Sequence, residues 1–200
     1  MNQLLLIDYA EVLSKPFSDD SMTSLARQLH MDVSEFKERY WEYRAPYDRG
    51  QSDRDYWETV AGRELDDDTL ATLIKIDVDG WTDLDPRAEG WLSDLNAAGS
   101  RPWLLSNAPH PLADAVELLP LTSSFAGLLF SCRIGEAKPS AQCFSVALKA
   151  MGATPECVTF IDDRQTNIEA AARLGLNTYL FTGNYPQPDH VLHPNRAQNI

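Results

Sequence analysis

The sequence has few cysteines and no long apolar run. Its three cysteines, Cys132, Cys143 and Cys157, are odd in number and form no CxxC pair. This argues against a disulfide framework or a structural zinc site and favours a reducing compartment. No apolar segment approaches the roughly 18 residues of a membrane-spanning helix, and the N-terminus lacks the basic region of a signal peptide. We therefore expect a soluble cytoplasmic protein.

Basic residues are also scarce. The chain has 17 Lys and Arg against 30 Asp and Glu, a net charge of −13. Such a surface repels nucleic acid and anionic membranes, so neither is an expected partner. A small anionic substrate would bind only where nearby cationic side chains outweigh the negative electrostatic potential of the whole protein. The 44% hydrophobic fraction of the 200 residues supports one core, with room for a small insertion.

Short apolar runs alternate with helical patterns in the second half of the chain. The runs are 4–7, 103–105, 158–161 and 178–181, with a weaker one at 127–130. Between them, helix-type apolar spacing recurs over 88–95, preceded by Asp85-Pro86 as N-cap and first residue, and over 144–151 and 168–174. Continuous apolar strands alternating with such helices indicate an α/β fold with a parallel sheet covered on both faces.

The segment from about 15 to 84 differs from the rest. It contains no convincing strand, is rich in aromatic and charged residues, and has a helix-like stretch near 66–76. We interpret it as a helical insertion, 15–84, in a core made of 1–14 and 85–200. The tail GNYPQPDHVLHPNRAQNI is rich in Pro and Asn, and we expect it to pack irregularly.

Polar side chains follow the apolar runs. They are Asp8 after the first run, Ser106 and Asn107 after the second, Lys138 in GEAKPS, and Asp162 and Asp163 after 158–161. Sites in open parallel sheets form at the carboxyl ends of the strands, so we expect these side chains to share one crevice. Three carboxylates in one place repel each other unless a cation holds them, and Mg²⁺ prefers such oxygen ligands. With a lysine, a hydroxyl and an amide, the group would cradle a phosphoryl dianion, which one carboxylate could attack to give an aspartyl-phosphate.

Four stretches, LLLIDYAEVL, LLSNAP, GEAKPSAQCF and FIDDRQTNIEAAARLGL, resemble in order and spacing the four motifs of the haloacid dehalogenase superfamily. YWEYRAPYDRGQSDRDYW resembles the helical cap that many of its members insert after the first motif. The resemblance implies a Rossmann-like core with a mobile helical cap, hinged near 14–16 and 83–86. Most members are Mg²⁺-dependent phosphatases and a minority are dehalogenases.

The resemblance also assigns roles by position. Asp8 would be the nucleophile and a metal ligand, and the backbone carbonyl of Ala10 would complete the metal shell. Asp163 would bind Mg²⁺ directly, with Asp162 assisting. Ser106 and Asn107 would bind phosphate, and Lys138 would neutralise Asp8 and the transferred group. The expected partner is a small phosphorylated metabolite, and the expected assembly a monomer or homodimer.

Ala10 departs from the family pattern, because phosphatases of this superfamily usually carry an Asp two residues after the nucleophile. That residue protonates the leaving oxygen, which is worth roughly 10²–10⁴-fold in rate. Three outcomes are open. The substrate has a good leaving group, another group such as Glu11 or His110 substitutes, or the protein binds phosphates and turns them over poorly. Taken alone, His110 reads as a loop residue and Glu11 as a solvent-facing one.

The leading hypothesis is a Mg²⁺-dependent phosphomonoesterase. A catalytically weak phosphate-binding or interaction protein is the alternative that Ala10 motivates. A haloacid dehalogenase is less expected, because the first motif of dehalogenases typically has Tyr at the position of Ala10 and their chemistry needs no paired acids for a metal.

Overall fold

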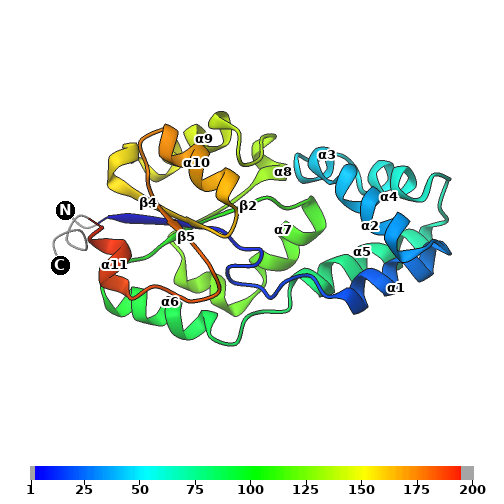
Figure 1. Ribbon diagram of the computed structural model, residues 1–200, viewed down its shortest axis with the longest axis horizontal. Coiled ribbons are helices and arrows are strands. Elements are labelled where there is room, and N and C mark those ends of the chain that lie inside the picture. Colours follow the sequence, from blue (N-terminus) through cyan, green and yellow to red (C-terminus); the bar gives the residue numbers. More distant parts are fainter. Residues whose placement is uncertain (1–2, 195–200) are drawn as a thin grey trace.

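A five-stranded parallel sheet forms the centre of the computed structural model, which describes residues 3–194 (Figure 1). Its strand order is β3-β2-β1-β4-β5. The strands are β1 (Leu4–Ile7), β2 (Trp103–Ser106), β3 (Gly127–Phe130), β4 (Val158–Asp162) and β5 (Asn177–Leu180). All five predicted runs form strands, and the predicted parallel α/β sheet is confirmed. The strand that carries the first motif, β1, is central, between β2 and β4.

Helices cover both faces of the sheet. They are α6 (Ala88–Ala97), α7 (His110–Glu117), α8 (Ser131–Ile134), α9 (Ala141–Met151), α10 (Gln165–Arg173) and α11 (Pro188–Leu192), with the 3₁₀ turns η1 (Pro120–Ser124) and η2 (Pro155–Cys157). Successive side chains of β1 point to opposite faces. Leu5 and Ile7 therefore pack in a core with α6, α7 and α11, whereas Leu6 packs with α9 and α10. Both faces are thus buried, which explains the unbroken apolar runs.

Two sequence-based expectations for this region need correction. Asp85 and Pro86 precede α6 instead of forming its first turn, and Asp85 Oδ1 accepts a hydrogen bond from Arg87 N at 2.8 Å. The tail is less irregular than expected, because α11 forms within it and buries Val191 and Leu192. Two apolar side chains on a short helical turn are enough to anchor it. Residues 195–200 lie outside the described part of the chain.

The second region consists of five helices with a core of their own (Figure 1). They are α1 (Asp19–Leu29), α2 (Val33–Glu42), α3 (Arg44–Asp48), α4 (Asp53–Ala61) and α5 (Asp67–Trp81), and we call residues 19–81 the helical module. Tyr40, Tyr47, Tyr56 and Trp57 are buried in its core. Helix α5 runs five residues beyond the predicted end at 76. The buried Asp77 interrupts the apolar pattern that the prediction relied on.

Two neighbouring segments connect the helical module to the sheet. Ser14 and Leu84 form an antiparallel bridge, and Lys15 pairs with Asp83 at 2.9 Å. The two connecting segments therefore lie side by side. They fall at 14–16 and 83–86, where the resemblance places the hinges. Across residues 3–194, the helices are too short or too polar for any of them to cross a membrane.

Candidate functional site

Asp8 lies just past the carboxyl end of the central strand. Its backbone N–H donates to Ile161 of the neighbouring strand at 2.9 Å, and its side chain accepts from Tyr9 N at 2.7 Å. Only 5% of the residue is exposed. Because β1 is flanked by β2 and β4, Asp8 lies next to whatever follows those strands, as the strand order predicts.

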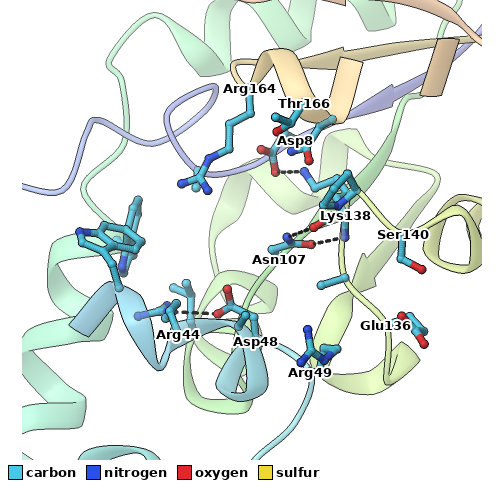
Figure 2. A pocket seen from close by; sticks show the side chains of 18 residues that line it. Asp8, Arg44, Asp48, Arg49, Asn107, Glu136, Lys138, Ser140, Arg164 and Thr166 are labelled. Atoms are coloured by element: carbon cyan, nitrogen blue, oxygen red, sulfur yellow. Dashed lines mark hydrogen bonds and ion pairs between the residues drawn. The ribbon is translucent and has the colours of Figure 1, made fainter. Parts of the chain in front are cut away.

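Lys138 bridges two of the carboxylates. Its Nζ lies 2.6 Å from Asp8 Oδ1 and 2.8 Å from Asp162 Oδ2, and its side chain is almost fully buried. The loop that carries it is held by Asn107, whose Nδ2 donates to the Lys138 carbonyl and whose Oδ1 accepts from Lys138 N, both at 2.9 Å (Figure 2). Both ends of the Asn107 amide thus position the lysine. This positioning role is separate from the phosphate contact that the resemblance implies for Asn107, which stays a prediction.

The two acids after β4 have different environments. Asp162 is fully buried and accepts hydrogen bonds from Arg164 N at 2.8 Å and from Asn167 Nδ2 at 2.9 Å. Asp163 is half-buried and has one carboxylate oxygen in the same cluster. Asp162 is therefore held by neighbouring groups, whereas Asp163 is the freer ligand.

The three carboxylates form a compact group. Asp8, Asp162 and Asp163 each offer an oxygen, and these oxygens lie within 4.8 Å of one another. Burial raises the pKa of Asp8 well above its usual range, although Lys138 pulls it down. Burial and the adjacent Asp162 also raise the pKa of Asp163, to about 6. One lysine thus leaves this negative charge incompletely compensated, and an all-oxygen donor set fits a hard divalent cation such as Mg²⁺.

Ser106 ends the strand beside Asp8. Its Oγ is buried and finds no hydrogen-bond partner among the described residues. Unpaired buried hydroxyls are unusual in folded proteins and call for an explanation. A donor at the carboxyl end of β2, next to Asp8, has the chemistry needed to bind an oxyanion.

A cavity of about 400 Å³ opens between the sheet and the helical module. The core side contributes Asp8, Ala10, Asn107, Lys138, Arg164 and Asn167, and the helical module contributes Trp41, Arg44, Ala45, Asp48, Arg49 and Trp81 (Figure 2). Its lining holds four cationic side chains and three carboxylates, against 17 basic and 30 acidic residues in the whole chain. The cavity lining thus does not share the acidic excess of the whole chain.

Glu11 and His110 were suggested as replacements for the acid that is missing at Ala10. Neither of them lines this cavity. Glu11 lines a separate pocket with Lys15 and Asp163. His110 begins α7, and its Nε2 lies beside Gly50. The helical module contributes Arg44, Asp48 and Arg49 to the polar lining of the cavity instead.

Sequence reasoning missed Arg44 and Asp48. Arg44 Nε donates to Asp48 Oδ1 at 2.8 Å, and Arg44 Nη1 also contacts the buried Asp77 at 3.2 Å. The four-residue spacing of Arg44 and Asp48 in YRAPYD is a signal for the pair on one helix face. The partner at Asp77 comes from a helix far along the chain and left no such signal.

Comparisons with known proteins bear on the fold and the family of the chain. The chain is 36% identical over 91 residues to bifunctional epoxide hydrolase 2 of Sus scrofa, which is 45% of this chain and 14% of that protein. It therefore matches only a small part of that relative. It superimposes on a HAD family enzyme from Bacteroides thetaiotaomicron with a TM-score of 0.75 at 19% identity, covering 94% of this chain and 97% of that one. Another structure of that enzyme contains magnesium and inorganic phosphate.

A second structural neighbour has a different activity. The L-2-haloacid dehalogenase of Xanthobacter autotrophicus superimposes with a TM-score of 0.67 at 19% identity, covering 94% of this chain and 80% of that one. Identities this low establish the fold alone. The sequence profile of haloacid dehalogenase-like hydrolases matches residues 7–175, most of the chain. The chain therefore belongs to the haloacid dehalogenase-like hydrolases.

Proposed function

We propose that the protein is a Mg²⁺-dependent phosphomonoesterase that acts on a small organic phosphate through an aspartyl-phosphate on Asp8. The buried group of Asp8, Lys138, Asp162 and Asp163 carries this proposal. A dehalogenase forms an ester on the equivalent carboxylate but has no need for clustered acids that hold a cation. The magnesium and phosphate bound by a structural neighbour support the same reaction class.

Each side chain of the site has its own role in the proposed reaction. Asp8, already turned toward Lys138, attacks phosphorus, and the leaving oxygen departs on the opposite side. Lys138 and the Ser106 hydroxyl stabilise negative charge on the equatorial oxygens. Asp163 and Asp8, with Asp162 beside them, would hold Mg²⁺, and the bound ion would supply further positive charge at the transferred group. Water then hydrolyses the phosphorylated Asp8.

The cavity cations favour an anionic substrate. Arg49 and Arg164 line the cavity, and neither forms an ion pair within the described part of the chain. Both remain available to a phosphate or to a second acidic group, which offsets the overall charge of −13. The volume of about 400 Å³ suits a small metabolite.

A substrate screen tests the proposal. Sugar phosphates, other alkyl phosphates and an activated aryl phosphate are incubated with the protein and Mg²⁺, and phosphate release is measured with and without a chelator. We expect release that the chelator abolishes and added Mg²⁺ restores. If none of these substrates releases phosphate while inorganic phosphate still binds, the protein would be a phosphate-binding protein. Halide release from 2-haloacids that survives the chelator would indicate a dehalogenase.

The affinity for Mg²⁺ is expected to fall with falling pH, and to fall more steeply below pH 6. Burial raises the pKa of Asp8 well above its usual range and that of Asp163 to about 6, so at low pH the folded protein holds protons on both carboxyl groups that the ion must displace. Each displaced proton weakens binding about tenfold for each pH unit below the pKa of its group. Isothermal titration calorimetry between pH 5 and 7, in two buffers of different ionisation enthalpy, measures both the affinity and the proton release. A pH dependence that does not steepen below pH 6 would contradict the assignment of Asp163 as a ligand.

A further inference from the structure

The position of the leaving group sets the requirement for a proton donor. In-line attack by Asp8 places the leaving oxygen beyond phosphorus, on the side of the cavity that faces away from Asp8. That side is formed by the helical module. Ala10 offers no proton, so a donor for the leaving oxygen would have to come from a side chain across the cavity.

Asp48 is the carboxylic acid that the helical module contributes to this lining. Figure 2 shows Asp8 and Asp48 on opposite sides of the cavity, with Asn107 between them. The third carboxyl group of the lining, Glu136, lies beyond Ser140 at the edge of the same view.

Asp48 is held firmly in this place. Arg44 Nε binds its Oδ1, and Arg44 is itself anchored by Asp77. The Asp48 carbonyl accepts a hydrogen bond from the Ser131 hydroxyl of α8, so this residue joins the helical module to the core. Its Oδ2 accepts no hydrogen bond from the described residues, and 14% of the side chain is exposed. One oxygen is therefore fixed by Arg44 and the other is free.

Resting on the proposed phosphatase function, we propose that Asp48 is the general acid and base of this site and replaces the aspartate that Ala10 lacks. In the first step, Asp8 forms a bond to phosphorus and the bond to the leaving oxygen breaks. That oxygen takes the proton of Asp48 and leaves as an alcohol. In the second step, the Asp48 carboxylate removes a proton from water, the hydroxyl attacks phosphorus, and the bond to Asp8 breaks. Inorganic phosphate is released and Asp48 carries its proton again.

The burial of Asp48 favours its role as a proton donor. It raises the pKa of Asp48 above the usual range of an aspartic acid, although Arg44 opposes the shift. The donor belongs to the helical module, so it is in place only when the module is docked on the core through Ser131. Proton transfer is thereby linked to a closed cavity, as in enzymes gated by lids.

Asp48→Asn is the direct test, with kcat/KM measured for an alkyl phosphate and for p-nitrophenyl phosphate. This quantity reports the steps up to departure of the leaving group, so the later role of Asp48 as the base that activates water does not enter it. An alkoxide is a poor leaving group and needs the proton, whereas p-nitrophenolate departs without one. We expect kcat/KM to fall by roughly 10²-fold for the alkyl ester and by less than about tenfold for the aryl ester. Ala10→Asp should change the wild type only a few-fold and should restore alkyl ester turnover in Asp48→Asn.

Two controls separate acid catalysis from structural effects. Glu136→Gln removes the other free carboxyl group of the lining and should keep the wild-type pattern. Asp77→Asn loosens the Arg44 that positions Asp48 but keeps the Asp48 carboxyl group, so it should lower kcat/KM for the alkyl ester by less than Asp48→Asn does. An equal loss for both esters in Asp48→Asn, or a selective loss in Glu136→Gln, overturns the proposal.

A series of phosphates with leaving groups of graded acidity gives a test on the unmodified protein, should Asp48→Asn fail to fold. A proton donor makes kcat/KM nearly independent of leaving-group acidity. A steep dependence, or a large gain from Ala10→Asp in the wild type, overturns the inference. Either result leaves the phosphatase function intact, because release of p-nitrophenolate requires attack by Asp8 and no proton from Asp48.

Discussion

Asp8→Asn is expected to lower phosphomonoester turnover by on the order of 10⁴-fold or more, because an amide cannot attack phosphorus and removal of a nucleophile has effects of this size. Initial rates with p-nitrophenyl phosphate in saturating Mg²⁺ provide the measurement. Acid-quenched wild-type protein should yield a phosphorylated peptide that contains Asp8, and the variant should yield none.

The same substitution should leave the fold at least as stable. Burial raises the pKa of Asp8, which means that its carboxylate form is disfavoured in the metal-free folded protein at neutral pH. Replacing it with a neutral side chain removes that cost, and Lys138 keeps Asp162 as a partner. Thermal unfolding in a chelator tests this expectation. The exposed Asp94→Asn on α6 is the matched control and should retain full activity. An Asp8→Asn protein with more than a tenth of wild-type turnover would refute the mechanism.

Lys138→Met is expected to lower both activity and stability. The lysine lies within 2.8 Å of both Asp8 and Asp162, so its loss leaves two buried carboxylates without a counter-charge. Breaking a buried pair by removing one partner costs about 3–5 kcal/mol of unfolding free energy. Turnover should fall by at least about 10³-fold, because a preorganised donor at the transferred group is lost as well.

Bound Mg²⁺ should reduce the destabilisation that Lys138→Met causes. Mg²⁺ supplies positive charge to the same carboxylates, so the destabilisation measured by urea unfolding should be larger in a chelator than in Mg²⁺. The exposed Lys149→Met on α9 makes the same chemical change away from the site, and its unfolding should match the wild type. If the destabilisation of Lys138→Met were equal with and without Mg²⁺, the ion and the lysine would not share these carboxylates.

Local sequence patterns were sufficient to predict the sheet and the core side of the site. Apolar runs of three or four residues form the strands, and the residue after each run lies at the same edge of a parallel sheet. Asp8, Ser106 and Asp162 follow this rule, since each ends or follows one of three adjacent strands. Lys138 is brought to the same edge by the loop before α9, where Asn107 holds it.

Buried polar residues interrupt the apolar patterns from which helix ends are predicted. Asp77 is a charged residue at an apolar position, so the end of α5 was placed too early, and its buried pairing with Arg44 joins residues 33 positions apart. The positioning role of Asn107 has no local signal either. An asparagine after a strand suggests a ligand contact, and only the packed loop shows that both polar atoms of its side-chain amide also bind the Lys138 backbone.

The apolar runs and the residues that end them were enough to assign the motifs to strands and to identify the three acids and the missing acid at Ala10. The packing of the helical module against the core brings Asp48 into the cavity lining, and this could not be predicted. The hydrogen bond between Ser131 and Asp48 joins residues 83 positions apart, and no local pattern encodes such a contact. The reason is physical: a strand sets the direction of its own side chains, but the facing wall of a cavity is set by how two separately folded regions pack.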